Sequence, residues 1–301
     1  MNSERIIGIT GGTGLVGKAL RAKLSSPVVL VMRHPSVDIR NNESVVLGSF
    51  SNPKVIEELV STVDVIIHAA TSVGPRSGFE DQFIEDDLVG TIKLAQSFFK
   101  KNPNGHFVYL STAGGLYNLE DPSVKIEISA VDPKSLYGAI KLIVEGALEN
   151  LDGKVTILRP SAIYGDSYKK NQTVGLIDKL LKSTISDEIV PIFDKVQSAR
   201  DYLHVDDLVE AILCLVDRKK GERFEVYNIG TGEEVSIEEI IKIINLVSSE
   251  KVKVEIVATP NERTSLIVNS NKVLCDVGWK SKILLKDGII KMYKSLKKGN
   301  E

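Results

Sequence analysis

The first 160 residues alternate short apolar runs with stretches of helical periodicity, and this alternation restricts the chain to few folds. We expect strands at Arg5–Thr10, Val28–Met32, Ser44–Leu47, Val63–Ala69, His106–Ser111 and Val155–Leu158. Helices are expected between them, the first ending near Leu24 and the others at Pro53–Val60, Gln82–Lys100 and Leu136–Asn150. Strands joined by helices run parallel and are covered on both faces. The sequence therefore predicts an α/β fold with a doubly wound parallel sheet.

The pattern changes after Arg159-Pro160, where the loops lengthen. Helices are expected at Val174–Ser183, Val205–Val216, Ile237–Ser248 and Leu285–Leu296, and strands at Ile189–Phe193, Val226–Ile229 and Val252–Val257. We therefore expect two domains, residues 1–160 and residues 161–301, with some later segments returning to the first. The second is expected to be a smaller mixed α/β domain that binds substrate.

Charge and cysteine content exclude several classes of protein. The chain has 38 basic and 40 acidic side chains, a net charge of −2, so a nucleic-acid or membrane-surface partner is not expected. Cys214 and Cys275 have no second cysteine or histidine at zinc spacing, so we expect neither a metal site nor a disulfide framework. No apolar run is long enough to cross a bilayer, and a cytoplasmic location is expected.

A glycine-rich turn follows the first expected strand. Thr10–Gly17 reads TGGTGLVG, and its glycines fit two registers, Gly12-Gly14-Gly17 and Gly11-Gly14-Gly17. Such a turn between a strand and a helix lets the backbone approach a pyrophosphate, which the free amides of the helix then bind. The turn predicts a dinucleotide site, the alternative being a glycine turn without a ligand.

The residue after the second strand bears on the choice of cofactor. NAD sites place an acidic side chain about twenty residues after the first glycine, to bind the adenine ribose. Here that place is taken by Met32, and Arg33 follows it. A guanidinium suits a ribose 2′-phosphate, so we expect NADP to be slightly favoured over NAD. The alternative is that Arg33 is a solvated strand end and that NAD binds.

Tyr137 and Lys141 lie four positions apart in an apolar-periodic helix and therefore share one face. A free phenol has a pKa near 10, and a nearby ammonium lowers it, which makes the tyrosine a usable acid and base. Ser111 and Thr112 end the fifth expected strand, where the carboxyl edge of a parallel sheet binds ligands. The set predicts proton transfer at an alcohol or ketone; a surface pair on the helix is the alternative.

Nine segments along the chain occur in the order of a known family. They are TGGTGLVG (10–17), VDVIIHAA (63–70), DLVGT (87–91), YLSTAGGLY (109–117), LYGAIK (136–141), LRPSAIYG (158–165), ARDYLHVDD (199–207), YNIGTGEEVS (227–236) and VGW (277–279). The whole chain resembles the extended short-chain dehydrogenase/reductases, specifically the NAD-dependent epimerase/dehydratase group that acts on nucleotide sugars. The resemblance implies a Rossmann-type sheet domain and a smaller sugar-binding domain.

The resemblance also implies roles for individual residues. Tyr137 is expected to be the catalytic acid and base, Lys141 its partner, and Thr112 or Ser111 the hydroxyl that holds the sugar oxygen. The residues expected to bind the cofactor are Gly11, Thr13, Gly14, Leu15, Val16, Gly17, Arg33, Ala69, Ala70, Tyr137, Lys141 and Pro160. The residues expected to bind the substrate are Arg200, Arg263, Thr112 and Tyr137, with the two arginines on the pyrophosphate. A structural ion pair with Asp206 or Asp207 is the alternative for Arg200.

Departures from the family pattern narrow the chemistry. Dehydratases of this group carry an aspartate and a glutamate where this chain has Ala113-Gly114, so a 4,6-dehydratase is not expected. Asp87 replaces the usual asparagine before Gly-Thr, and Ser49 replaces a usual aspartate. The expected function is a nucleotide-sugar 4-epimerase that transfers a hydride transiently to nicotinamide. The alternatives are an NADPH-dependent 4-keto nucleotide-sugar reductase and a non-catalytic NAD(P)-binding sensor.

The resemblance further implies a homodimer, formed by the helices expected at Gln82–Lys100 and Leu136–Asn150. The apolar faces of these helices are equally explained by packing on the sheet. The nucleotide, the hexose and the direction of flux do not follow from the sequence.

Overall fold

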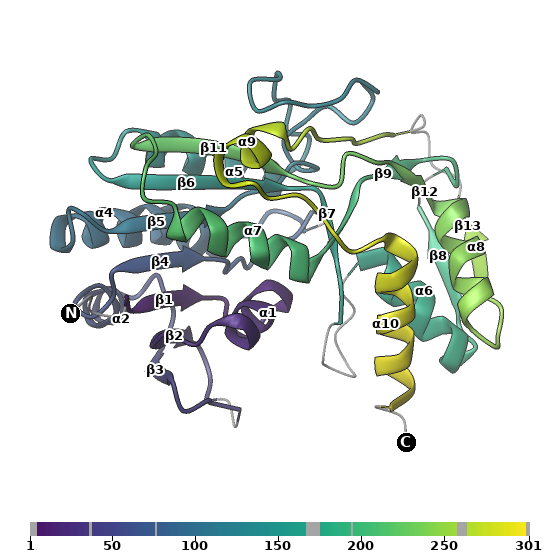
Figure 1. Ribbon diagram of the computed structural model, residues 1–301, viewed down its shortest axis with the longest axis horizontal. Helices are drawn as coiled ribbons and strands as arrows, with labels where there is room; N and C mark the ends of the chain where they lie inside the picture. The colour runs from purple at the N-terminus through teal and green to yellow at the C-terminus, as the bar shows by residue number, and fades with distance from the viewer. Residues whose placement is uncertain are drawn as a thin grey trace. The chain divides into compact units, whose positions relative to one another are not determined.

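Seven strands form the central sheet of the computed structural model, which describes residues 5–35, 38–75, 77–166, 175–193, 195–257 and 264–298. In sheet order they are β11 (Phe224–Ile229), β6 (Lys154–Pro160), β5 (His106–Leu110), β4 (Val65–His68), β1 (Ile7–Thr10), β2 (Val28–Met32) and β3 (Glu43–Leu47) (Figure 1). Neighbouring strands run parallel, with Thr10 level with Val31 on one side and His68 on the other. The expected α/β fold with a parallel, Rossmann-type sheet is confirmed.

The chain divides into two units, each described here by itself. Unit 1 comprises Met1–Leu116, Val131–Arg159 and Ile212–Tyr227, and unit 2 comprises Tyr117–Ala130, Pro160–Ala211 and Asn228–Glu301. β11, from the later part of the chain, lies beside β6 in the sheet of unit 1.

Helices cover both faces of the sheet in unit 1. On one face, α2 (Pro53–Val60), α4 (Thr91–Lys101) and α5 (Leu136–Glu149) pack together, and α1 (Leu15–Lys23) lies on the other (Figure 1). Leu59, Phe98 and Val144 are fully buried in the apolar cluster that joins the first three helices to the strands. Burying such side chains stabilises a fold by about 1.5–3 kcal/mol each. The order of the strands reverses between β1 and β4, and ligands bind at such a point in doubly wound sheets.

Local signals fix where helices begin. Asn52 caps α2 by accepting a hydrogen bond from the Lys54 amide at 2.9 Å, and Pro53 occupies the first turn, where a missing N–H costs nothing. Ser135 caps α5 by accepting from the Gly138 amide at 3.2 Å. This cap places Tyr137 in the first turn of α5.

One expected helix is interrupted. In place of a continuous helix at residues 82–100, the chain forms α3 (Asp81–Phe83), the π-helix η1 (Ile84–Gly90) and α4. A π-helix is rare and is found frequently at functional sites. Hydrophobic periodicity did not reveal it, because the buried residues of η1 include two aspartates, Asp86 and Asp87.

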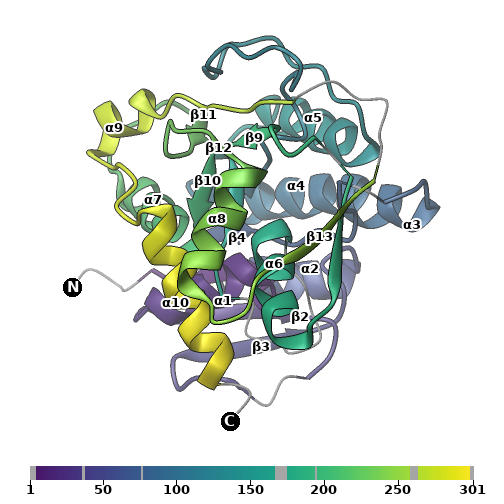
Figure 2. The ribbon, with the colours of Figure 1, turned by 90° about the vertical axis from the view of Figure 1, so that its right-hand side faces the viewer.

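Unit 2 is built from short strand pairs and helices. The pairs are β7 (Ala162–Tyr164) with β10 (Tyr202–His204), β9 (Ala199–Arg200) with β12 (Val235–Ser236), and β8 (Ile189–Ile192) with β13 (Lys253–Ile256). The helices are α6 (Gly175–Ser186), α8 (Ile237–Val247), α9 (Asn271–Val277), α10 (Leu285–Lys298) and the first half of α7 (Val205–Asp217). Figure 2 shows α6, α8 and α10 side by side, and Leu180, Ile240 and Ile289 form their shared core. The single tryptophan, Trp279, is buried here and donates to the Asp207 carbonyl at 3.0 Å.

In the part of the chain that the structure describes, no helix has both the length and the apolar character that crossing a bilayer requires.

Candidate active site

The glycine turn after β1 brings two backbone segments into contact. Gly11 has a φ of +77°, and a Cβ there would lie 2.7 Å from the carbonyl carbon of Ala69 and the amide nitrogen of Ala70. A Cβ on Gly17 would lie 2.2 Å from the Gly11 carbonyl oxygen. Only glycine fits at either place, because real Cβ atoms do not approach backbone so closely. The turn after β1 therefore lies directly against the end of β4, at the reversal of strand order.

The amino terminus of α1 fits a phosphate group. The N-cap is Gly14, which offers no side chain to the helix amides, and the first turn contains no acidic residue. The amides of Leu15 and Val16 lie in this first turn, where the helix dipole is positive. The tight glycine packing and the uncapped helix end suit the pyrophosphate of NAD or NADP.

Two arginines near the end of β2 differ in their surroundings. Arg33 is exposed just beyond β2. Arg21 of α1 is buried and forms an ion pair with Glu43 of β3 at 2.7 Å. Arg21 also donates to the carbonyl of Asp38, so it ties the segment after β2 to α1 and β3. Arg33 is exposed, as is Arg40 farther along the same segment, where the Arg40 amide donates to Glu43 at 2.9 Å.

Lys141 lies under the ring of Tyr137 in the buried part of α5. Its Nζ is 5.8 Å from the centroid of the Tyr137 ring, 4.6 Å from that of Tyr109, and donates to the Leu110 carbonyl at 2.8 Å. Burial lowers the pKa of Lys141 to about 8, against the opposing effect of two acidic residues, Asp87 and Glu145.

The pKa of Tyr137 is raised, where the sequence led us to expect a lowered value. Burial is the largest cause, a hydrogen bond with Thr112 acts against it, and the negative charge of Asp87 adds to the rise. The Lys141 amine is directed at the Leu110 carbonyl, so in this structure it does not offset the burial of the phenol.

The two candidate hydroxyls after β5 point to different partners. Ser111 is buried and donates to the Glu145 carboxylate. Thr112 is half-buried and accepts from the Gly115 amide at 3.1 Å. A Cβ on Gly115 would lie 2.6 Å from the Thr112 methyl group and 3.1 Å from the Tyr137 ring, so the loop and α5 are in close contact. The structure thus brings Thr112 together with Tyr137 and turns Ser111 away from it.

Sequence reasoning missed a buried ion pair beneath this group. Arg159, near the end of β6, pairs with Glu145 of α5 at 2.6 Å, and both side chains are almost fully buried. Glu145 follows Lys141 by four positions and Ser111 donates to it, so the pair joins β5, β6 and α5. The helical spacing from Tyr137 to Lys141 to Glu145 was visible in the sequence, but the partner on β6 was not.

In unit 2, Arg200 donates to the Thr264 carbonyl at 3.0 Å and to the Thr264 hydroxyl at 2.6 Å. The carboxylates proposed as its alternative partners have other contacts: Asp206 pairs with Lys291 at 2.6 Å, and Asp207 accepts from the amides of Lys282 and Ile283. Arg263 lies outside the described residues.

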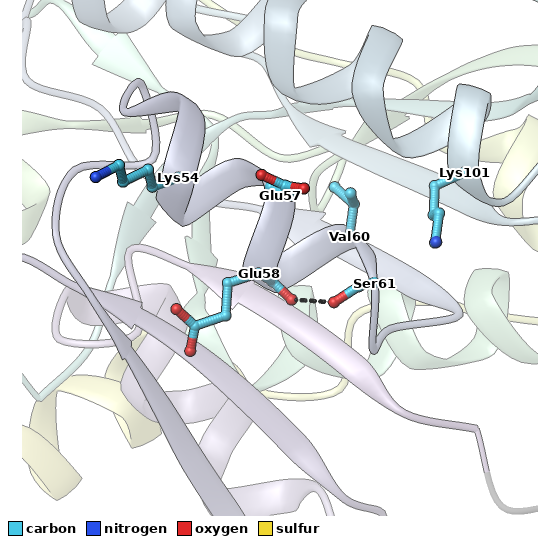
Figure 3. Close-up of a pocket in the computed structure, with 6 residues that line it drawn as sticks. All are labelled: Lys54, Glu57, Glu58, Val60, Ser61 and Lys101. Atoms are coloured by element: carbon cyan, nitrogen blue, oxygen red, sulfur yellow. Dashed lines mark hydrogen bonds between the residues drawn. The ribbon is translucent and has the colours of Figure 1, made fainter.

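A surface depression beside α2 lies apart from the candidate site residues described above. It is lined by Lys54, Glu57, Glu58, Val60, Ser61 and Lys101, and Figure 3 shows the Ser61 hydroxyl bonded to the Glu58 carbonyl. All but Val60 are exposed, and none of the predicted catalytic or cofactor-binding residues is among them.

The sequence profile of the "NAD dependent epimerase/dehydratase family" matches residues 7–230, from β1 to the end of β11. The chain belongs to this family. Its relatives include the dTDP-4-dehydro-6-deoxyglucose reductase of Escherichia coli, 26% identical over 96% of each chain. A putative UDP-glucose 4-epimerase of Methanocaldococcus jannaschii is also 26% identical, over 97% of this chain and 98% of the relative.

Solved structures agree with membership of the epimerase/dehydratase family. The UDP-glucose 4-epimerase of Thermotoga maritima, solved with UDP-glucose, has a TM-score of 0.84 at 23% identity and covers 98% of this chain and 100% of its own. The UDP-glucuronic acid 4-epimerase of Bacillus cereus, in complex with UDP-glucuronic acid and NAD, has a TM-score of 0.86 at 21% identity, covering 97% and 99%. These likenesses establish the fold, and the family match confirms the expected enzyme class of NAD-dependent epimerases and oxidoreductases.

Proposed function

We propose that this member of the family is a nucleotide-sugar 4-epimerase. The observation that supports it most is the group of Thr112, Tyr137 and Lys141 at the carboxyl edge of the sheet, in the same unit as the glycine turn. This group contains one proton carrier, one hydroxyl to hold the reacting oxygen and one ammonium. Those are the requirements for interconverting an alcohol and a ketone.

The residues of the chain would act in two half-reactions. Tyr137 takes the proton of the sugar 4-hydroxyl while Thr112 holds the same oxygen, and after the keto sugar turns its other face, Tyr137 returns the proton. When bound, a nicotinamide cofactor would supply hydride transfer at carbon 4, and the glycine turn of Gly11, Gly14 and Gly17 with the amino terminus of α1 would hold its pyrophosphate. Lys141 supplies a positive charge that opposes the negative charge on the phenolate. We further propose that Arg200 and Arg263 bind the pyrophosphate of the sugar nucleotide.

Elimination of water is disfavoured by the residues after Thr112. The two positions that carry carboxylates in dehydratases are Ala113, which is fully buried, and Gly114. Neither offers a group that moves a proton, so the proposal is confined to chemistry at one carbinol.

A 4-keto nucleotide-sugar reductase that uses NADPH is the second candidate. The observation that favours it is Arg33, whose exposed guanidinium follows β2 and has no carboxylate among its immediate neighbours in sequence. A non-catalytic sensor is a third possibility, against which the presence of Tyr137 and Lys141 counts.

Analysis of bound nucleotide and turnover tests the main proposal. We expect NAD to be released from the denatured protein, and we expect the protein to interconvert a UDP-hexose and its 4-epimer without added reductant. Tyr137→Phe should lower turnover by about 10²–10⁴-fold with cofactor affinity nearly unchanged, because only the proton carrier is lost. Retention of wild-type turnover by Tyr137→Phe would remove the tyrosine from the mechanism.

Two matched substitutions separate the candidate hydroxyls. Thr112→Val should reduce turnover strongly, since it removes the hydroxyl bonded to Tyr137. Ser111→Ala removes the donor to Glu145 and should act mainly on stability, so a larger loss of turnover in Ser111→Ala would reverse the assignment.

Charge reversal at Arg33 decides between the cofactors. Arg33→Asp should weaken NADP binding at least tenfold relative to NAD, because a carboxylate repels a 2′-phosphate and accepts from a ribose hydroxyl. Fluorescence titration of wild type and variant with NADPH and NADH measures the ratio. An unchanged ratio would show that Arg33 is only a solvated strand end.

A further inference from the structure

His68, the last residue of β4, is held at both ring nitrogens by threonine hydroxyls. Its Nδ1 lies 2.8 Å from the Oγ1 of Thr10, the last residue of β1. Its Nε2 lies 3.1 Å from the Oγ1 of Thr91, the first residue of α4. All three residues are at most 1% exposed. The ring therefore joins the strand that leads into the glycine turn to the helix that follows η1.

Neighbouring aromatic rings fix the plane of the His68 ring. The Phe50 ring stands almost perpendicular to it, with centroids 4.8 Å apart, and the Tyr109 ring lies nearly parallel, with centroids 5.8 Å apart. Burial lowers the pKa of His68 to about 3, and the charge of Lys141 acts in the same direction, so the ring is neutral near pH 7. A neutral imidazole has one donor nitrogen and one acceptor nitrogen, so the two threonines receive different hydrogen bonds.

The contacts of Thr10 decide which nitrogen carries the proton. Its Oγ1 accepts from the Ala70 amide at 3.4 Å, so its own hydroxyl proton remains to be donated. Among the residues that the structure describes, the acceptor for this proton is the Nδ1 of His68. We assign the ring proton to Nε2, which donates to Thr91. The opposite assignment would leave the Thr10 hydroxyl proton buried without an acceptor, which is costly.

Thr10 joins the two backbone segments that meet at the glycine turn. Its carbonyl accepts from the Ala69 amide at 3.2 Å, and its hydroxyl accepts from the Ala70 amide. The next residue is Gly11, against which the same two alanines lie so closely that no Cβ fits. The orientation of the Thr10 side chain, which His68 fixes, therefore bears directly on the shape of the turn.

The loop that follows the two alanines has an anchor of its own. Asp87 of η1 accepts from the backbone amides of Ser72, at 2.8 and 2.9 Å, and Val73, at 2.8 Å. It also accepts from the Thr71 hydroxyl at 3.4 Å. None of these hydrogen bonds involves His68. A change at His68 should therefore act on the glycine turn and leave the rest of the loop held.

We propose that His68 is a positioning residue for the dinucleotide, and that its ring, protonated at Nε2, holds Thr10 so that the glycine turn and Ala69–Ala70 keep the arrangement that binds the pyrophosphate. The inference rests on the dinucleotide site of the proposed function, but not on the sugar or on the reaction. A protein that adopts its binding arrangement only part of the time binds correspondingly less tightly. Loss of the Thr10 contact should therefore weaken cofactor binding and leave turnover at saturating cofactor nearly unchanged.

Two substitutions separate the two nitrogens of His68. An asparagine oxygen reaches the place of Nδ1, so His68→Asn can still accept from Thr10. A glutamine amide reaches the place of Nε2, so His68→Gln can donate to Thr91 but loses the Thr10 contact. Titration of the nucleotide-free full chain with NADH and with NADPH, followed by cofactor fluorescence, measures the Kd. We expect the Kd to rise about tenfold in His68→Gln and less than about threefold in His68→Asn.

Thr10→Val tests the same contact from its other side, since it keeps the shape of the side chain and removes the hydroxyl. It should raise the Kd about as much as His68→Gln, roughly tenfold. The double variant should bind no more weakly than either single variant, because both substitutions remove one interaction. Strictly additive losses in the double variant would contradict the proposal.

His106→Gln is the matched control. His106 is also buried, and its Nε2 lies 2.8 Å from the Thr156 hydroxyl. It begins β5 and is paired with Val65, the first residue of β4, so it lies at the opposite edge of the sheet from the glycine turn. We expect His106→Gln to lower the free energy of unfolding but to keep the wild-type Kd. An equal rise of the Kd in His106→Gln would overturn the proposal.

Nitrogen-15 NMR of the histidine rings tests the assigned proton without any cofactor, and His68→Gln identifies the resonances of His68 among the four histidines. We expect Nε2 to be protonated and Nδ1 to be unprotonated. A proton on Nδ1 would overturn the proposal, as would an unchanged Kd in a folded His68→Gln variant. Should His68→Gln not fold, the Kd of Thr10→Val decides.

The two proposals fail in different ways. If no UDP-hexose is turned over but the Kd for NADH rises in His68→Gln, the proposed function fails and the role of His68 stands. If sugars are turned over and the Kd is unchanged in His68→Gln, the reverse holds. Failure of the wild type to bind either NADH or NADPH would contradict both.

Discussion

Asp87 in unit 1 and Asp201 in unit 2 are buried in similar ways but have different consequences. Each accepts from two backbone amides and a threonine hydroxyl, those of Asp201 being the amides of Thr231 and Gly232 and the hydroxyl of Thr231. Asp201 also accepts from the Ser161 hydroxyl at 3.1 Å. Burial raises the pKa of both carboxyls. The neighbours differ: a lysine and a tyrosine respond to the charge of Asp87, whereas hydrogen-bond donors alone oppose the burial of Asp201.

The comparison separates two uses of a buried carboxylate. Asp201 accepts hydrogen bonds from Ser161 and from Thr231, and so joins the two segments that contain these residues. Around Asp87 a similar anchor holds the loop after β4, which follows Ala69 and Ala70 at the glycine turn.

The buried histidines of the two units differ in whether an acidic residue lies near them. His68 lies between the hydroxyls of Thr10, at 2.8 Å, and Thr91, at 3.1 Å, and burial lowers its pKa to about 3. His106, also in unit 1, contacts the Thr156 hydroxyl, and burial lowers its pKa to about 3 as well. In unit 2, His204 lies 3.7 Å from Asp206, whose charge opposes the lowering.

Acid should therefore destabilise the fold mainly through unit 1. Because the pKa values of His68 and His106 are lowered from 6.5, the unfolded chain binds more protons between about pH 6.5 and 3. Their contribution to stability is fully present above pH 6.5 and is lost as the pH falls, by about 1.4 kcal/mol per pH unit for each histidine. Urea denaturation at pH 7 and pH 5, followed by Trp279 fluorescence and far-UV circular dichroism, measures the loss.

Glutamine substitutions assign this loss to residues. His106→Gln and His68→Gln should each flatten the dependence of stability on pH, whereas His204→Gln should change it less and the exposed His34→Gln is a control. The raised pKa values of Asp87 and Asp201 act in the opposite sense at lower pH, so slopes are compared between variants and not taken alone. If His204→Gln reduced the dependence of stability on pH more than His68→Gln and His106→Gln did, the loss in acid would come mainly from unit 2.

Asp201→Asn should lower the free energy of unfolding by about 1–3 kcal/mol. In the wild type, both carboxylate oxygens accept from backbone amides, whereas in the variant one oxygen is replaced by an NH₂ group, which leaves a backbone N–H without its acceptor. Asp206→Asn removes a part-exposed ion pair with Lys291 and the charge near His204, and should cost less than Asp201→Asn, about 1 kcal/mol. A loss in Asp206→Asn as large as that in Asp201→Asn would show that burial of the carboxylate does not set the cost.

Sequence reasoning located the elements that have strong periodicity. Val28–Met32 and Pro53–Val60 were predicted with the bounds that the structure has, because an all-apolar strand and a capped amphipathic helix are local signals. The contact of Thr112 with Tyr137 was left open between two hydroxyls, since a strand end does not reveal which way its side chains turn.

What the sequence did not reveal depends on partners distant in the chain. The strands β9 and β12 have two residues each, too few for any period, and their pairing joins positions 35 residues apart at Arg200 and Val235. The ion pair of Glu145 with Arg159 and the anchor at Asp201 likewise join elements through buried charges that hydrophobic patterns do not mark. The π-helix was missed because its inward residues are acidic.

The π-helix also limits how the chain can vary in length. Each of its turns holds more residues than an α-helical turn, and its seven residues lead directly into α4. Removing one residue from Ile84–Gly90 would restore α-helical winding and rotate whatever precedes the deletion relative to the sheet. In this stretch the number of residues matters as much as their identity, because η1 packs against α5, the helix that carries Tyr137.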